Sequence, residues 1–108
     1  MESLYVFGIA QSMRKAVMRQ QNLMAQIEKR FGVSWDEVVG PSRERQATYC
    51  RQLATLMMRE YDMSLQGIGD VLHRHHTTII ASLRKIRALC KYDPEVAEDV
   101  AYLRGGPR

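Results

Sequence analysis

The stretch Ser64–Ile86, SLQGIGDVLHRHHTTIIASLRKI, decides the fold of this chain. It predicts two short helices joined by a tight connection. Ser64 can cap the first helix because its hydroxyl accepts hydrogen bonds from the free N–H groups of the first turn. Apolar residues recur at helical spacing on both sides of the connection, at Leu65, Ile68, Val71 and Leu72 and at Ile79, Leu83, Ile86 and Cys90.

A polar block, His73–Thr78, separates the two apolar faces. Short donor-rich side chains at the start of a second helix are typical of a helix-turn-helix, which presents them to the major groove of DNA. The hydroxyl and methyl groups of Thr77 and Thr78 suit base edges and thymine methyls. His76 can donate to an acceptor, and Arg74 suits a phosphate or a guanine edge. The alternative is that Thr77 and Thr78 merely cap the second helix.

The positive charge of the chain is concentrated in the segment that contains the helix pair. The chain has 108 residues, which fits one domain without room for a large active-site cavity. Its formal net charge is +4. Residues 43–91 hold nine Lys or Arg and four Asp or Glu, a net charge of +5. The excess therefore lies on the segment that contains the helix pair, as a phosphate-facing surface requires.

Other kinds of site find little support. Gly67-Ile68-Gly69 lacks the Lys-Ser/Thr of a phosphate-binding loop, so we expect no enzyme, no nucleotide and no other cofactor. His73, His75 and His76 lack the spacing of four and the further ligands typical of zinc, so we expect no metal. Cys50 and Cys90 lie on apolar faces and are predicted to be buried thiols. No run is long enough for a signal peptide or a membrane span, which predicts a cytoplasmic, nucleoid-associated protein.

The N-terminal part predicts a long helix over about residues 10–31. Gly8 is expected to break the apolar residues 1–9, which form either a frayed tail or a docking segment. One face of the helix carries a stripe in four/three alternation. Either the helix packs on its own domain through this stripe, or the stripe is the seam of a homodimer. Its members are Met13, Val17, Gln20, Met24, Ile27 and Phe31.

The rest of the chain predicts three more helices and a basic loop, which gives an all-α fold of about six helices. Gly32 ends the long helix, and Ser34 caps a short helix that reaches about Val39. A basic loop precedes a long helix over about residues 44–61. Asp93 caps a last helix, with Pro94 in its first position.

The helix pair also resembles the C-terminal DNA-binding domain, domain IV, of the bacterial chromosomal replication initiator DnaA. The resemblance covers about residues 24–104 and implies a Trp-repressor-like helix-turn-helix domain at 32–108, preceded by an N-terminal segment and long helix at 1–31. The residues that carry it are Ile68–Leu72, Arg74, His76–Ser82, Arg84–Ile86, Ile27–Val33, Arg43, Arg45, Arg51-Gln52, Asp93–Glu95 and Glu98–Val100.

The resemblance also implies roles for particular residues. His76, Thr77 and Thr78 would enter the major groove, and Arg43 in the basic loop would reach into the adjacent minor groove. A further set would lie near the phosphate backbone: Arg45, Arg51, Arg59, Ser64, Leu65 and Lys85.

Departures from the family suggest that the DNA sequence read is not an unaltered DnaA box. The family usually has Asp, which accepts from a cytosine amine, where this chain has His75, whose imidazole suits a guanine acceptor. The family's turn has glycine in place of His73 and is often one residue longer, and a common Glu is replaced by Gly67. We find no counterpart of the family's ATPase domain and expect a stand-alone protein.

The sequence thus predicts a bacterial or phage protein that binds specific double-stranded DNA. It would recognise a DnaA-box-like element and regulate transcription or replication initiation by occupancy. The alternative is an adaptor that binds a component of the replication machinery and modulates initiator activity without reading DNA. In the adaptor, helix 10–31 would take part in binding that component, whereas the separate homodimer hypothesis uses the same helix as its seam.

Overall fold

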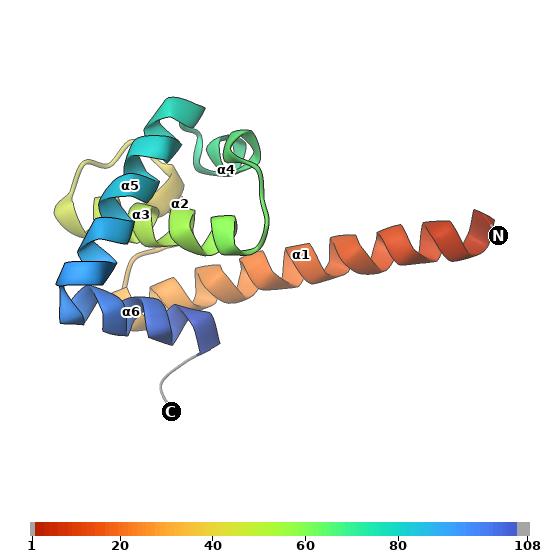
Figure 1. Ribbon diagram of the computed structural model, residues 1–108, viewed down its shortest axis with the longest axis horizontal. Helices are drawn as coiled ribbons and strands as arrows, with labels where there is room; N and C mark the ends of the chain where they lie inside the picture. The colour runs from red at the N-terminus through yellow and green to blue at the C-terminus, as the bar shows by residue number, and fades with distance from the viewer. Residues whose placement is uncertain (1, 106–108) are drawn as a thin grey trace.

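Six α-helices make up this computed structural model, which describes residues 2–105, with side chains from residue 17 onward. They are α1 Glu2–Phe31, α2 Trp35–Val39, α3 Arg45–Glu60, α4 Leu65–Leu72, α5 His76–Tyr92 and α6 Pro94–Gly105 (Figure 1). Between residues 2 and 105 there is no strand. The predicted all-α fold with a helix-turn-helix is confirmed.

The helix α3 lies at the centre of the domain and contacts each of the other five helices. Leu53, Ala54, Met57 and Met58 on this helix are almost completely buried. Thr55 is buried as well, and its hydroxyl donates to the Arg51 carbonyl oxygen at 2.8 Å. Since burial of a large apolar side chain contributes roughly 1.5–3 kcal/mol, this helix is the main source of core stability.

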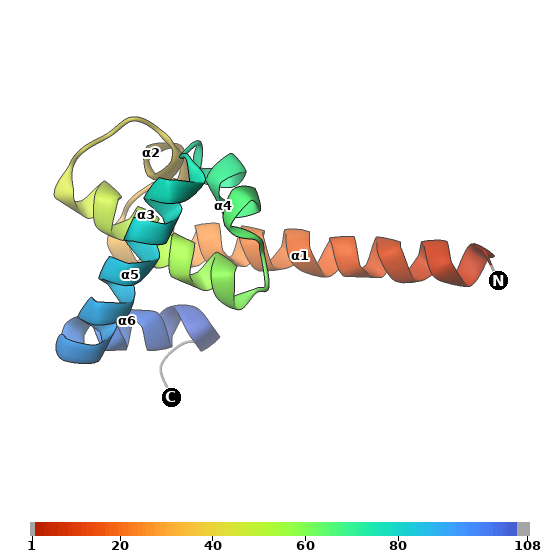
Figure 2. The ribbon, with the colours of Figure 1, turned by 45° about the horizontal axis from the view of Figure 1, so that its top comes forward.

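The helix α1 is longer than predicted, because it begins at Glu2 and continues through Gly8. The expected break at Gly8 is wrong: one glycine inside a helix costs only about 1 kcal/mol. The last turns of α1 pack in the domain, where Leu23 and Ile27 are fully buried. The preceding part projects away from the other helices (Figures 1 and 2).

The predicted stripe on α1 is therefore divided. Ile27 is buried, Phe31 and Met24 are half-buried, and Val17 is 54% exposed. Leu23 is not a member of the predicted stripe, yet its side chain is fully buried. Met13 lies outside the described side chains. The boundary at residues 31/32 stays a prediction, although the end of α1 belongs to the same hydrophobic core as the later helices.

Local sequence signals set the helix ends as expected. The Ser34 Oγ accepts from the first turn of α2 at 3.3 Å, and the Ser64 Oγ accepts from that of α4 at 2.9 Å. The Asp93 Oδ1 accepts from the Glu95 N–H at 2.9 Å, where Pro94 begins α6. Gly32 follows α1 with a φ of +69°, a left-handed conformation that favours glycine.

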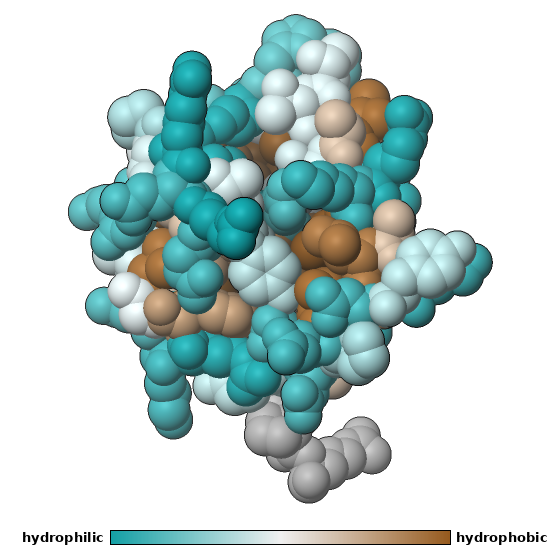
Figure 3. Space-filling model, turned by 90° about the vertical axis from the view of Figure 1, so that its left-hand side faces the viewer, coloured by the Kyte–Doolittle hydropathy of each residue, from teal (hydrophilic) through white to brown (hydrophobic). Residues whose placement is uncertain are grey.

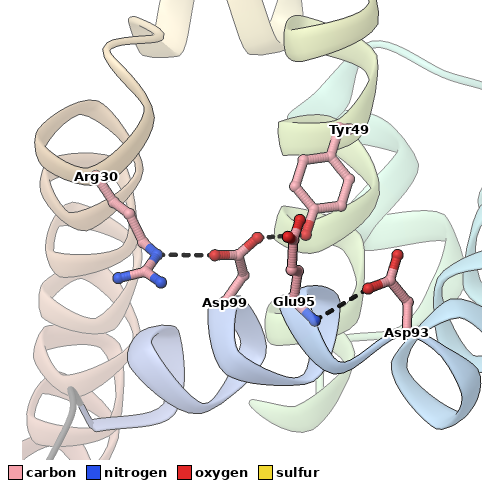
Figure 4. A network of polar contacts seen from close by, with 5 residues as sticks. All are labelled: Arg30, Tyr49, Asp93, Glu95 and Asp99. Atoms are coloured by element: carbon pink, nitrogen blue, oxygen red, sulfur yellow. Dashed lines mark hydrogen bonds and ion pairs between the residues drawn. The ribbon is translucent and has the colours of Figure 1, made fainter.

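Three polar side chains, which we call the Asp99 network, join α1, α3 and α6 (Figure 4). The carboxylate of Asp99 accepts from the Arg30 Nε at 2.9 Å and from the Tyr49 hydroxyl at 2.6 Å. Burial raises the pKa of the Tyr49 phenol, and the hydrogen bond to Asp99 raises it further. The network holds the last turn of α1 and the helix α6 against the central helix.

The two cysteines differ in environment. Cys50 is fully buried, and burial raises the pKa of its thiol to about 12. Cys90 is half-buried, so the prediction of two buried thiols is correct for Cys50 and too strong for Cys90. Cys90 lies near the end of α5, one turn beyond the last fully buried residue of that helix, Ile86.

Candidate nucleic-acid interface

The turn between α4 and α5 packs closely against α4. A Cβ atom on Gly69 would lie 2.4 Å from the Arg74 carbonyl oxygen, so only glycine allows the turn to approach this near. His73 ends α4 in the left-handed region, with φ 56° and ψ 44°. A glycine would adopt that conformation without the steric cost that a Cβ brings.

The side chains at the start of α5 are exposed, and His75 caps the helix. Its Nδ1 accepts from the Thr77 N–H at 3.3 Å and lies 2.9 Å from the Thr77 hydroxyl oxygen. In a neutral ring, an accepting Nδ1 leaves the proton on Nε2, which is then available as a donor. His76, Thr77 and Thr78 follow in the first turn, all exposed. The residue that caps α5 is thus His75, whose ring also contacts the Thr77 hydroxyl, rather than Thr77 or Thr78.

Arginines line two shallow grooves beside α5. One groove, of about 450 Å³, is bounded by Arg59, Ser64, Leu65, Gln66 and His76. The other, of about 400 Å³, is bounded by Arg59, Leu65, Ile80, Leu83, Arg84 and Arg87. Arg59 and Leu65 contribute to both grooves, so the end of α3 and the start of α4 lie along the exposed face of α5.

The basic loop, residues 40–44, lies on the other flank of α5. Arg43 and Arg45 are exposed and line a groove of about 770 Å³ together with Lys85 of α5. Tyr49, Leu89 and Val96 also line it, and the acidic residues Asp93, Glu95 and Asp99 stand at the α6 end. Figure 3, which views the side where Figure 1 draws this loop, shows apolar patches divided by hydrophilic side chains.

Arg51 and Arg74 are turned toward backbone carbonyls. The Arg51 guanidinium donates to the carbonyl oxygens of Val38, Gly40 and Ser42, and that of Arg74 to those of Val39, Gly40, Leu72 and His73. We call the two guanidinium groups and these acceptors the arginine clamp. Burial lowers the pKa of Arg51, and the nearby charge of Arg74 lowers it further.

The twelve residues predicted for the site fall into three groups. Leu65 is half-buried, and Arg51 and Arg74 belong to the arginine clamp. The other nine are exposed around the start of α5 and on its flanks: Arg43, Arg45, Arg59, Ser64, His75, His76, Thr77, Thr78 and Lys85. The DNA contacts themselves stay predictions. The sequence reasoning did not assign Gln66, Ile80, Arg84 or Arg87, although the last three recur at helical spacing.

Two further properties bear on the kind of site. Among the described residues, no three His, Cys, Asp or Glu side chains come together in a group that could hold a metal ion. The helices of the described chain include none with the length and apolar character needed to cross a membrane.

Known proteins with similar sequences point to one family. The family described as "Bacterial dnaA protein helix-turn-helix" matches residues 20–86, which include the end of α1 and most of α5. A chromosomal replication initiator protein DnaA from Microcystis aeruginosa is 32% identical over 93 residues, which are 84% of this chain and 21% of that protein. The chromosomal replication initiator protein DnaA from Bifidobacterium animalis subsp. lactis is 34% identical over 71 residues, which are 64% of this chain and 12% of that protein.

A third DnaA, from a Synechococcus strain, is 39% identical over 61 residues, 55% of this chain and 13% of that protein. The chain thus spans about an eighth to a fifth of the length of these relatives. The match of the family covers more than half of the chain and includes α4, the turn and the start of α5. The chain belongs to the bacterial DnaA helix-turn-helix family, a DNA-binding domain of a non-catalytic kind.

Proposed function

We propose that this protein binds double-stranded DNA in a sequence-specific way, with the start of α5 in the major groove. The observation that carries the proposal is the exposed run His75–Thr78 at the N-terminus of α5, flanked on both sides by arginines. A helix start of this kind presents donors to base edges, while the flanking cations fix the register on the phosphate backbone. Thr77 and Thr78 are the base readers, and His76 donates or stacks beside them.

The basic loop supplies the second contact in this proposal. Arg43 enters the adjacent minor groove, since it is exposed on the flank of α5 that also carries Arg45 and Lys85. Arg45, Arg59, Ser64, Leu65 and Lys85 lie along the phosphates. Contacts from both flanks of one recognition helix would fix its register and orientation on the duplex.

His75 distinguishes the sequence that the protein reads. Its Nδ1 serves as the cap of α5, so its Nε2 donor is the atom that faces a base edge. A donor at this position favours the O6 or N7 acceptors of guanine. We therefore propose a target that differs from a DnaA box at the base pair next to His75.

The biological role that follows is occupancy of such sites. The relatives are named chromosomal replication initiator proteins, and a domain that binds similar DNA would regulate replication initiation or transcription at the nucleoid. Val17 and Met18, 54% and 60% exposed on the projecting part of α1, are available to a second copy, which keeps the homodimer through helix 10–31 as a proposal. Sedimentation equilibrium tests it, and a monomer at high concentration would refute it.

Fluorescence anisotropy against random and selected duplexes tests the DNA-binding proposal. We expect Thr77→Ala to cost about 1–3 kcal/mol of affinity for the selected duplex alone. Arg45→Ala should weaken all duplexes alike and lower the salt slope by about 1. Lys29→Ala, which removes an exposed cation from α1, is the matched control and should change neither quantity. Absence of salt-dependent duplex binding at low ionic strength would refute the proposal and favour the adaptor.

A further inference from the structure

We infer that Arg51 and Arg74 are positioning residues that fix the basic loop relative to α5 and so set the spacing between the minor-groove and major-groove contacts. The inference rests on the proposed function, because it concerns how the two contacts are held together. It changes the role that sequence resemblance implies for Arg51, and the role predicted for Arg74, from DNA contact to support of the DNA-contacting segments.

The Arg51 guanidinium donates to three backbone carbonyl oxygens. Its Nε donates to the Val38 carbonyl oxygen at 2.7 Å, and its Nη2 donates to those of Gly40 at 3.2 Å and Ser42 at 3.0 Å. Arg51 thus joins the central helix α3 to the end of α2 and to two points of the basic loop. A fork of N–H donors at fixed geometry can hold several carbonyls at once, which a lysine cannot do.

Arg74 reaches the same loop from the turn before α5. Its Nη2 donates to the Gly40 carbonyl oxygen at 2.7 Å, and its Nη1 lies 3.4 Å from that of Val39. The same Nη1 donates to the Leu72 carbonyl oxygen at 3.0 Å and to that of His73 at 3.2 Å. The single guanidinium of Arg74 therefore links the basic loop to the helix-turn-helix.

The two arginines meet at a single acceptor, the Gly40 carbonyl oxygen. Gly40 itself is tightly placed, because a Cβ there would lie 2.7 Å from the Asp36 carbonyl oxygen. Among bonds between described residues, the carbonyls of Gly40 and Ser42 accept from these arginines and from no backbone N–H outside the helices. The clamp therefore supplies the hydrogen bonds that a loop of this length would otherwise take from water.

A bidentate phosphate contact through the bonded nitrogen atoms would require these guanidinium groups to leave their carbonyls. Arg51 uses Nε and Nη2, and Arg74 uses both Nη1 and Nη2. Both residues are half-buried, whereas Arg43, Arg45 and Arg59 are exposed. Exposed arginines on the same surface can meet the phosphates without breaking any of the bonds in the clamp.

The test separates positioning from charge by using lysine variants. Arg51→Lys and Arg74→Lys keep the charge, so a phosphate contact would survive largely intact, whereas a fork of several carbonyl bonds would not. We expect each variant to bind the selected duplex about tenfold or more weakly, the usual loss when a multiply bonded arginine is replaced. Arg19→Lys, which changes an exposed arginine of α1 outside the interface, is the control and should stay within about threefold.

A duplex library measures the preference for one spacing between the two contacts, a quantity that a simple loss of stability would not change. In this library, one base pair is inserted or removed between the parts of the site read by Arg43 and by Thr77. The unchanged protein should prefer one spacing, and both lysine variants should lose that preference while remaining folded by circular dichroism. In addition, Arg43→Ala should cost less in the Arg74→Lys background than alone, since residues that act through one another are not additive.

A second variant covers the case in which a lysine variant does not fold. One glycine inserted between Pro41 and Ser42 leaves both arginines in place and should abolish the spacing preference in the same way. Lysine variants that keep wild-type affinity and spacing preference would overturn the inference and restore the phosphate role. Failure of the unchanged protein to bind any duplex would instead refute the proposed function, and the inference would fall with it.

Discussion

The Asp99 network and the arginine clamp use the same residue type in opposite ways. In the Asp99 network, Arg30 faces a carboxylate, so the positive charge is neutralised where the helices meet. In the clamp, Arg51 and Arg74 face uncharged carbonyls. Both sets of hydrogen bonds join separate segments of the chain, but the charge of the clamp stays available to the surface above it. Carbonyl partners thus stabilise a loop without removing the field that attracts phosphates.

The largest effect that would test this comparison is expected at Gly69, beneath the turn that carries Arg74. Gly69→Ala places a Cβ about 2.4 Å from the Arg74 carbonyl oxygen and forces the turn outward. We expect a loss of about 3 kcal/mol in the free energy of unfolding, measured by urea denaturation, because backbone cannot yield as a side chain can. Specific DNA affinity should fall as well, since the turn carries half of the clamp.

Gly67→Ala is the matched control for this variant. Its Cβ would meet the Ser64 Oγ at 3.0 Å, a contact with a side chain that needs to shift by only a few tenths of an ångström. We expect the free energy of unfolding to stay within about 1 kcal/mol of the wild-type value, because alanine also favours the helix. A Gly69→Ala protein as stable as this control would show that the turn is not held as closely as described.

A smaller effect is expected at Tyr49, on the side of the Asp99 network. Tyr49→Phe removes the 2.6 Å bond to Asp99 and should cost about 1 kcal/mol of unfolding free energy at pH 7. Affinity for the selected duplex should not change, in contrast to Gly69→Ala. Loss of DNA affinity without loss of stability would contradict the separation between the two regions.

The same variant has a pH signature. The pKa of the Tyr49 phenol is raised in the folded protein, so the unfolded chain releases this proton first as the pH rises above about 10. The stability that Tyr49 contributes is therefore complete below pH 10 and lost above it. Urea denaturation from pH 8 to 11 should show a steeper fall for the wild-type protein than for Tyr49→Phe, and equal slopes would contradict the raised pKa.

The smallest effect is expected at His73, within the turn itself. His73 has a left-handed backbone, which costs a residue with a Cβ about 1–2 kcal/mol. Glycine avoids this steric cost but loses more conformational entropy on folding, which offsets part of the gain. We expect His73→Gly to raise the free energy of unfolding by about 0.5–1 kcal/mol. DNA affinity should stay within twofold, because the side chain is exposed and belongs to no predicted contact. A destabilised variant would indicate that the His73 side chain has a partner.

Features that depend on neighbouring residues could be predicted from the sequence. Ser34, Ser64 and Asp93 act through N–H groups two or three residues away, so their caps were visible in the order of residues. The apolar spacing of Ile79, Leu83 and Ile86 likewise predicted the buried face of α5. The comparison with DnaA supplied the candidate roles at the start of this helix.

Features that depend on distant residues could not be predicted. The Arg74 guanidinium meets carbonyls more than thirty residues earlier, and nothing in the local sequence indicates that a long cationic side chain will turn inward. The buried Leu23 was missed for a similar reason: the stripe gives the period of α1, but the docking angle against α3 decides which members are covered. The expectation that Gly8 ends the helix was wrong because a single glycine lowers helix stability only modestly.

The uninterrupted course of α1 has a mechanical consequence. A single helix runs from the buried Ile27 through Gly8 to Glu2, so its projecting end is rotationally locked to the core that carries α5. Each residue added to or deleted from the projecting part would turn everything before it by about 100° and shift it by about 1.5 Å. The number of residues in this helix therefore sets the direction in which any surface at its far end faces, relative to the exposed face of α5.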